Sequence, residues 1–203
     1  KMRQDGNDLV AAFIRASQWD TLPAQVQQKA REAFVDALGA ILVGTLTPVS
    51  RITADYAGVA FRGDEATILV HGGRATAAGA AFANAYAANG IDIDDCAKYT
   101  RGHPGAQLIP ATLAVAEKVG ASGREVLTAL VVGYEVAHRA ARCWHDHHEV
   151  YQSCGSWGSM ACAAVAARLL GLEHETIKTA LGIAEYHAPN LPMMRDIDHP
   201  AMV

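Results

Sequence analysis

The sequence has little charge, and its charged residues form no block of one sign. Only 19% of its 203 residues are charged, the net charge is −4, and most Lys and Arg residues stand singly. A nucleic-acid-binding domain usually carries a basic patch or stripe. The sequence therefore predicts no nucleic-acid partner. An anionic ligand would have to be held by a few placed cations and by backbone amides.

Cysteine is scarce as well, and long apolar runs are missing. The four cysteines form no C-x-x-C pair, which argues against an iron–sulfur cluster or a structural zinc site. Sparse cysteines are typical of reduced thiols in a cytosolic protein. Residues 1–8 contain no signal-peptide core, and the apolar run 161–167 is too short to span a bilayer. We expect a soluble, cytoplasmic protein with no membrane partner.

Apolar residues make up 51% of the chain, enough for a sizeable core in one domain. Apolar periodicity and alanine content predict helices over the following ranges: 8–18, 21–44, 50–61, 75–89, 107–119, 122–144, 153–170 and 173–185. The short run 66–70 is strand-like, and we interpret it as an extended connector. The sequence therefore predicts an all-α fold, a compact multi-helix domain of about eight helices.

Several of these helices carry end signals. Thr21 or a neighbour is a candidate cap for the second helix, and Pro23 lies where a missing N–H costs nothing. Pro110 is expected in the first turn of the fifth predicted helix, and Ser122 with Glu125 forms a capping box for the sixth. Asn89 followed by Gly90 is typical of a helix C-terminus.

The segment 90–110 concentrates polar chemistry between two alanine-rich, nearly uncharged stretches. Twelve of its residues include three carboxylates, a thiol, two cations and a histidine: Asp92, Asp94, Asp95, Cys96, Lys98, Arg101 and His103. Charged groups resist burial unless they are paired or used. This segment is therefore the first candidate for a functional site.

In an extended backbone, Asp92 and Asp94 would lie on one side and Asp95 on the other. Clustered carboxylates raise one another's pKa, and histidine titrates near physiological pH, which suits proton transfer. Lys98 and Arg101 could supply counter-charge for an anion. Two alternatives remain open: a solvated loop with helix-capping aspartates, or an Mg²⁺ or Ca²⁺ site at the three aspartates.

Three other features are candidates of lower specificity. The run H-D-H-H at 145–148 could bind a transition metal, but its spacing favours an exposed helix end. Ser153 and Ser156 at a helix start could present amides to an anion or simply cap the helix. Arg195 is a candidate ligand for a carboxylate.

Four segments, taken together and in order, resemble the MmgE/PrpD family. They are N-A-Y-A-A-N-G-I-D-I-D-D at 84–95, G-H-P-G-A-Q-L-I-P-A-T-L-A-V-A-E at 102–117, S-G-R-E-V-L-T-A-L-V-V-G-Y-E-V at 122–136, and A-A-V-A-A-R-L-L-G-L at 163–172. The family includes 2-methylcitrate dehydratase, cis-aconitate decarboxylase and iminodisuccinate epimerase. The likeness covers nearly the whole chain, and the combination of segments is specific.

The resemblance implies the helical main domain of that family, a homodimer, a small di- or tricarboxylate substrate, and no metal or cofactor. It also implies that Asp92 and His103 line the active site. Cys96 stands where the family commonly has threonine, and Gln152 stands where it has a second histidine. The loop between the aspartates and His103 is about one residue longer than in the decarboxylase members.

A family lysine would follow shortly after Val203, and the smaller lid domain lies beyond it. We therefore expect residues 1–203 to form the helical MmgE/PrpD-type domain, incomplete at its C-terminus. The expected function is a cofactor-free lyase, similar to 2-methylcitrate dehydratase, or an epimerase working by acid–base chemistry beside a carboxylate. Asp92 and His103 are the expected catalytic residues. The expected substrate-binding residues are Cys96, Lys98, Arg101, Gln152 and Arg195.

Two alternatives stand beside this expectation. One is a truncated or degenerate helical domain that dimerises or binds a ligand without turnover, which the glutamine at 152 favours. The other is a metal-dependent hydratase that uses Asp92, Asp94 and Asp95.

Overall fold

The computed structural model describes residues 5–190 and 192–193, and within them the chain is mostly helical. Its elements, in order, are α1 (Gly6–Ala16), a 3₁₀ turn (Trp19–Thr21), α2 (Ala24–Gly44), α3 (Pro48–Ala60), β1 (Ala66–Ile68), β2 (Gly73–Ala75), α4 (Ala77–Ala88), α5 (Pro104–Val119), α6 (Gly123–His147), α7 (Gly155–Leu169) and α8 (His174–Tyr186). The predicted all-α class and all eight predicted helices are confirmed.

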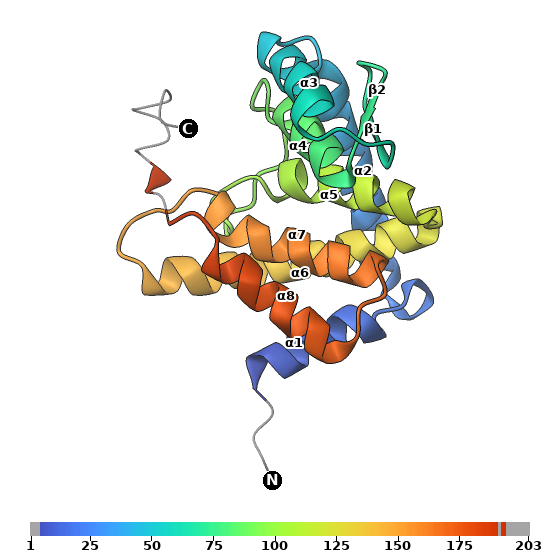
Figure 1. The fold of residues 1–203 in the computed structure, drawn as a ribbon. Coiled ribbons are helices and arrows are strands. Elements are labelled where there is room, and N and C mark those ends of the chain that lie inside the picture. The colour runs from blue at the N-terminus through green and yellow to red at the C-terminus, as the bar shows by residue number, and fades with distance from the viewer. Residues whose placement is uncertain (1–4, 191, 194–203) are drawn as a thin grey trace.

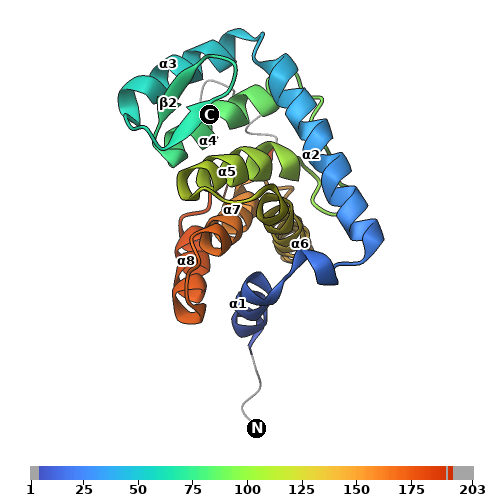
Figure 2. The ribbon, with the colours of Figure 1, turned by 90° about the vertical axis from the view of Figure 1, so that its right-hand side faces the viewer.

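The helices stack in layers, with α5 in the middle. Figure 1 shows α3, α4 and the small hairpin above α5, and α6, α7, α8 and α1 below it. α5 packs against α4 on one side and against α6 and α7 on the other. α2 runs along one side of the molecule and links the two levels (Figure 2). The loop between α4 and α5, residues 89–103, therefore joins two central helices.

Two apolar clusters hold these layers together. The larger one lies between α5, α6 and α7 and includes the fully buried side chains of Leu108, Leu130 and Trp157. The smaller one, rich in alanine, joins α3, α4 and the hairpin. Alanine and glycine let these helices approach closely: a Cβ added at Gly44 of α2 would clash with the carbonyl oxygen of Ala87 in α4.

Three local predictions are wrong. Residues 66–68 form a strand, not a connector, and pair antiparallel with 73–75. Glu117 of α5 accepts hydrogen bonds from Thr67 N and Thr67 Oγ1, both at 2.8 Å. A contact distant in the sequence therefore stabilises the strand. α5 begins at Pro104, which places Pro110 inside the helix. Thr21 lies in the 3₁₀ turn, where its hydroxyl donates to Gln18 O, and the N-cap position of α2 is its neighbour Pro23, with no side-chain capping bond.

Other end signals are confirmed. The Ser122 hydroxyl accepts from Glu125 N at the start of α6, and Asn89 is the C-cap of α4. No single helix among the described residues has both the length and the apolar character needed to cross a membrane. α2 and α3 have the necessary length and apolar character only when taken together, and the two helices are bent by 92° at their junction.

Candidate active site

The loop 89–103 is a folded structure rather than an extended chain. Asp92 and Arg101 both adopt left-handed backbone conformations, with φ of 56° and 50°; aspartate tolerates this region better than most residues. The buried Thr100 hydroxyl lies 3.0 Å from Ala97 O and 3.1 Å from Gly102 O. These turns reverse the chain and bring the acidic start of the loop against its histidine end.

His103 lies between two carboxylates. Its Nε2 is 3.4 Å from Asp92 Oδ1, and its Nδ1 is 3.2 Å from Asp94 Oδ2. The two carboxylates differ sharply in exposure: the Asp92 side chain is 80% exposed and the Asp94 side chain 0%. One side of the imidazole therefore faces solvent, and the other faces a sealed carboxylate.

Burial raises the pKa of Asp94 above its ordinary value, and hydrogen bonds from Asn89 and the charge of His103 oppose that rise. The Asn89 amide donates to both Asp94 oxygens, at 3.1 and 3.2 Å. Asn89 and His103 thus partner a carboxylate that burial alone would disfavour in its charged form.

Asp95 faces away from His103. Its Oδ1 accepts from Gly105 N at 2.7 Å, and its Oδ2 accepts from the Tyr134 hydroxyl at 2.9 Å. The predicted grouping, with Asp92 and Asp94 on one side and Asp95 on the other, is confirmed. The predicted extended backbone is wrong, because Asp92 is left-handed. The three aspartates consequently do not form one cluster, which removes the geometry expected for the three-aspartate Mg²⁺ or Ca²⁺ site.

The ligand-type atoms of Asp92, Asp94 and His103 do lie within 4.8 Å of one another. In the structure each carboxylate is nearest a different nitrogen of the ring. One oxygen of each carboxylate nevertheless lies within 4.8 Å of a single ring nitrogen, so these three residues could hold a cation.

Sequence reasoning missed three residues around this pair. Cys154, at the start of α7, lies with its Sγ 3.3 Å from the His103 backbone N–H, and burial raises the pKa of its thiol. Asn89 and Tyr134 hold Asp94 and Asp95. The available sequence signal was the pair of glycines around His103: a Cβ at Gly102 would clash with Cys154 Sγ, and one at Gly105 with Asp95.

The expected substrate-binding residues are only partly gathered here. Cys96, Lys98 and Arg101 lie on the same loop and are exposed. Within the described residues, neither Lys98 nor Arg101 forms a side-chain ion pair, and none of the three contacts Asp92 or His103 through a hydrogen bond. Gln152 is buried, and its Oε1 has no hydrogen-bond partner among the residues described. Arg195 lies outside the described residues.

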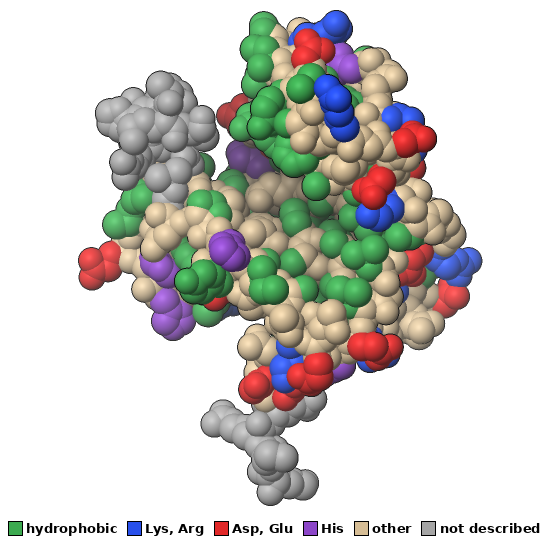
Figure 3. Space-filling view, viewed as in Figure 1, with side chains coloured by type: hydrophobic (Ala, Val, Ile, Leu, Met, Phe, Trp, Pro, Cys, Tyr) green, Lys and Arg blue, Asp and Glu red, His purple; other side chains and the backbone are tan. Residues whose placement is uncertain are grey.

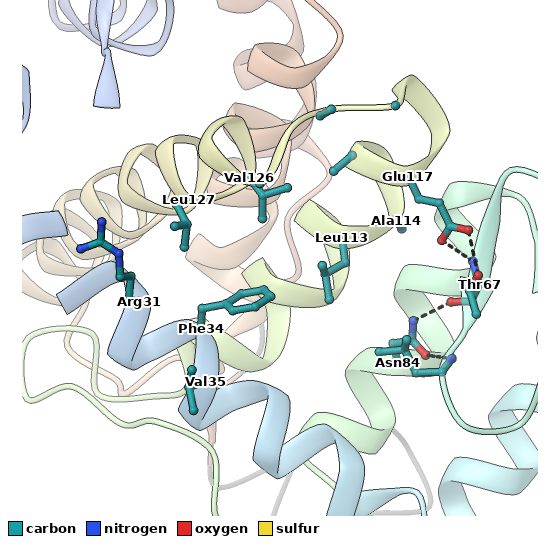
Figure 4. A pocket seen from close by; sticks show the side chains of 15 residues that line it. Arg31, Phe34, Val35, Thr67, Asn84, Leu113, Ala114, Glu117, Val126 and Leu127 are labelled. Carbon is teal, nitrogen blue, oxygen red and sulfur yellow. Dashed lines mark hydrogen bonds between the residues drawn. The ribbon is translucent and has the colours of Figure 1, made fainter. Parts of the chain in front are cut away.

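A cavity of about 870 Å³ lies elsewhere, between α2, α5 and α6. Figure 4 shows Phe34, Leu113 and Leu127 pointing into it from these helices. Its lining is mostly apolar and includes no residue of the loop 89–103. The Asp92–His103 pair is therefore a site at the molecular surface, separate from this cavity.

Comparison with known proteins gives a consistent picture. A family model described as the MmgE/PrpD N-terminal domain matches residues 8–197. The chain is 30% identical over 177 residues to the cis-aconitate decarboxylase-like protein oryM of Aspergillus oryzae, covering 80% of this chain and 36% of that protein.

Two further relatives match over a similar share of the chain, at 30% and 25% identity. The chain is 30% identical over 175 residues to the cis-aconitate decarboxylase of Homo sapiens, covering 82% of this chain and 36% of the human protein. It is 25% identical over 174 residues to that of Aspergillus terreus, covering 81% and 35%. The chain thus spans about a third of the length of these relatives.

Proposed function

This chain belongs to the MmgE/PrpD family, and on that premise we propose that it carries the acid–base centre of a lyase or epimerase acting on a small di- or tricarboxylic acid. The names of its relatives, a cis-aconitate decarboxylase-like protein and cis-aconitate decarboxylases, support lyase chemistry at the level of the family. The observation that carries the proposal is His103, held between an exposed and a buried carboxylate.

In this proposal His103 is the general acid or base. Asp94 orients the ring through Nδ1 from its sealed position, which leaves Nε2 on the exposed side as the proton-transferring atom. Asp92, the exposed partner of Nε2, would be displaced by substrate or would share its proton. Positioned proton transfer of this kind typically contributes about 10²–10⁴-fold to a rate.

The substrate carboxylates would be held by cations near the loop. Lys98 and Arg101 are exposed on that loop and have no ion-pair partner among the described residues, so both are free to meet an anion. We assign Arg195 the same role, and Cys96 and Gln152 the role of hydrogen-bonding groups. Anchoring matters here, because proton abstraction beside a carboxylate develops enolate-like charge that must be stabilised in place.

A specific residue favours a second candidate, a binding or dimerisation domain without turnover. Gln152 stands where the resemblance places a second histidine, and an amide cannot transfer protons at neutral pH. Its buried Oε1, which has no hydrogen-bond partner among the described residues, can accept a hydrogen bond from a ligand but cannot replace an acid or base.

Turnover and ligand binding distinguish the two candidates. The chain is screened with citrate, cis-aconitate, 2-methylcitrate and iminodisuccinate by thermal shift and by product assay, with and without EDTA. We expect one of these acids to stabilise the chain against thermal unfolding and to be turned over in the presence of EDTA. In His103→Asn, kcat for this acid should fall about 10²–10⁴-fold. His147→Asn, an exposed histidine at the end of α6, is the control and should leave kcat unchanged. Binding without turnover favours the second candidate, and loss of activity in EDTA favours the metal-dependent hydratase.

We also propose that two copies associate, through an apolar face of α3 and α4. Ile52, Tyr56 and Val59 follow one another at helical spacing on α3 and are 65, 55 and 67% exposed. Tyr56 contacts Phe82 of α4, whose ring lies 5.0 Å from that of Tyr86. Figure 3 shows hydrophobic side chains gathered over this part of the molecule. Apolar patches of this type, on the order of 500 Å², are often protein-binding surfaces.

A further inference from the structure

The backbone on both sides of His103 is held by groups that occupy the space of a missing side chain. On the N-terminal side, Cys154 Sγ fills the side-chain space of Gly102 and lies 3.3 Å from the His103 amide. On the C-terminal side, Asp95 fills the space of Gly105 and accepts from its amide at 2.7 Å. The histidine is therefore fixed through its main chain as well as through its ring.

Asp95 is in turn tied to the core by Tyr134 of α6. The Tyr134 hydroxyl donates to the second oxygen of Asp95 at 2.9 Å, and it would lie 2.8 Å from a Cβ at Gly105. Burial and the neighbouring Asp95 charge raise the pKa of this phenol, so it remains a donor. Tyr134 is flanked along α6 by the fully buried Val132 and Ala137, which makes α6 a firm anchor.

We propose that Tyr134 is a positioning residue, which acts through Asp95 and the Gly105 amide to hold the His103 ring between Asp92 and Asp94. The inference rests on the proposed acid–base function of His103 and goes one step beyond it. The two ring–carboxylate contacts, at 3.2 and 3.4 Å, lie at and beyond the upper end of the usual N–H···O range, which is about 3.2 Å. A small shift of the backbone at Gly105 would therefore break them.

A purely structural role for Tyr134 makes a different prediction. If Asp95 only capped the first turn of α5, loss of the Tyr134 hydroxyl would lower stability and leave the environment of the His103 ring unchanged. A positioning role requires that the ring itself respond. Misplacement of a catalytic group by about 1 Å can cost roughly 10²-fold in rate.

The test uses Tyr134→Phe, with Tyr99→Phe as its matched control. Tyr99 is on the same loop and 67% exposed, so its substitution removes a phenol hydroxyl without touching Asp95. The ring ¹³Cε1 and ¹⁵N signals of His103 are followed by NMR in chain labelled at histidine, with His103→Asn giving the assignment. We expect these signals to shift in Tyr134→Phe and to stay in place in Tyr99→Phe.

Asp95→Asn is the second variant, because Gly105 N and the Tyr134 hydroxyl donate to different oxygens of Asp95, and asparagine replaces one of these oxygens with an NH₂ donor. It should shift the His103 signals in the same way as Tyr134→Phe. For any acid that the chain turns over, Tyr134→Phe should lower kcat about tenfold or more and leave KM within about threefold of the unsubstituted value. Unchanged His103 signals in both folded variants overturn the positioning role, whether or not turnover is seen; absence of turnover with shifted signals counts against the proposed function alone.

Discussion

The His103 imidazole has a buried carboxylate beside one ring nitrogen and an exposed carboxylate beside the other. Asp94 is buried and held by Asn89, whereas Asp92 projects into solvent from a left-handed turn. A ring with one fixed and one replaceable partner keeps its orientation while its exposed nitrogen exchanges ligands. This asymmetry is what a surface acid–base group requires if it is to stay aligned between substrates.

The buried carboxylate has a consequence for stability. Burial raises the pKa of folded Asp94, so the folded chain binds its proton more tightly than the unfolded chain does. The free energy of unfolding should therefore fall as pH rises from about 4, the ordinary value for aspartate, to the raised pKa. Asp94→Asn removes this contribution, and its unfolding free energy should fall less over the same range.

Urea unfolding of both proteins between pH 3.5 and 7 measures this difference. Asp36→Asn, on the exposed side of α2, is the control and should follow the pH dependence of the unsubstituted chain. Parallel curves for Asp94→Asn and the unsubstituted chain would show that Asp94 titrates alike in the folded and unfolded states.

At the scale of elements, the loop depends on how closely α4 approaches its neighbours. Gly44 of α2 leaves no room for a side chain, because a Cβ there would clash with Ala87 O near the end of α4. The small residues of α4 allow this contact, and the end of α4 determines where the loop 89–103 begins.

Gly44→Ala should therefore destabilise the fold, by about 2 kcal/mol or more, since overpacking a close contact costs roughly 1–3 kcal/mol. Gly39→Ala is its control in the same helix, where a Cβ meets nothing within 4 Å. There the alanine should stabilise by about 0.5–1 kcal/mol through its higher helix propensity. Chemical denaturation checks both values. Equal effects of the two substitutions would mean that α2 moves away from α4 at no cost.

At the scale of the whole molecule, the proposed dimer depends on the apolar face of α3 and α4. Ile52→Asp combined with Tyr56→Glu places two charges on that face and should convert a dimer to a monomer. Light scattering coupled to size-exclusion chromatography measures the mass. Ile183→Asp, on α8 and 57% exposed, is the control and should leave the dimer intact. A monomeric unsubstituted chain, or a dimer that survives both charges, would contradict this placement.

Local patterns in the sequence were enough for the helices. Apolar periodicity and alanine content determine where each helix lies, because both act within a few residues. The same reasoning failed where a residue distant in the sequence determines the local structure. The strand at 66–68 is held by Glu117 of α5. α5 begins at Pro104, and the amide of Gly105 in its first turn donates to Asp95, ten residues earlier.

Local sequence patterns are sufficient for the all-α fold, for the family, and for the concentration of acids and a histidine between two helices. Helix packing establishes which groups meet: the Asp94 side chain is fully buried, Asp95 accepts from Tyr134, and Cys154 contacts the His103 amide. These contacts join residues up to 51 positions apart. Such pairings depend on the packing of α4, α5, α6 and α7, and composition and periodicity contain no information about which side chains that packing brings together.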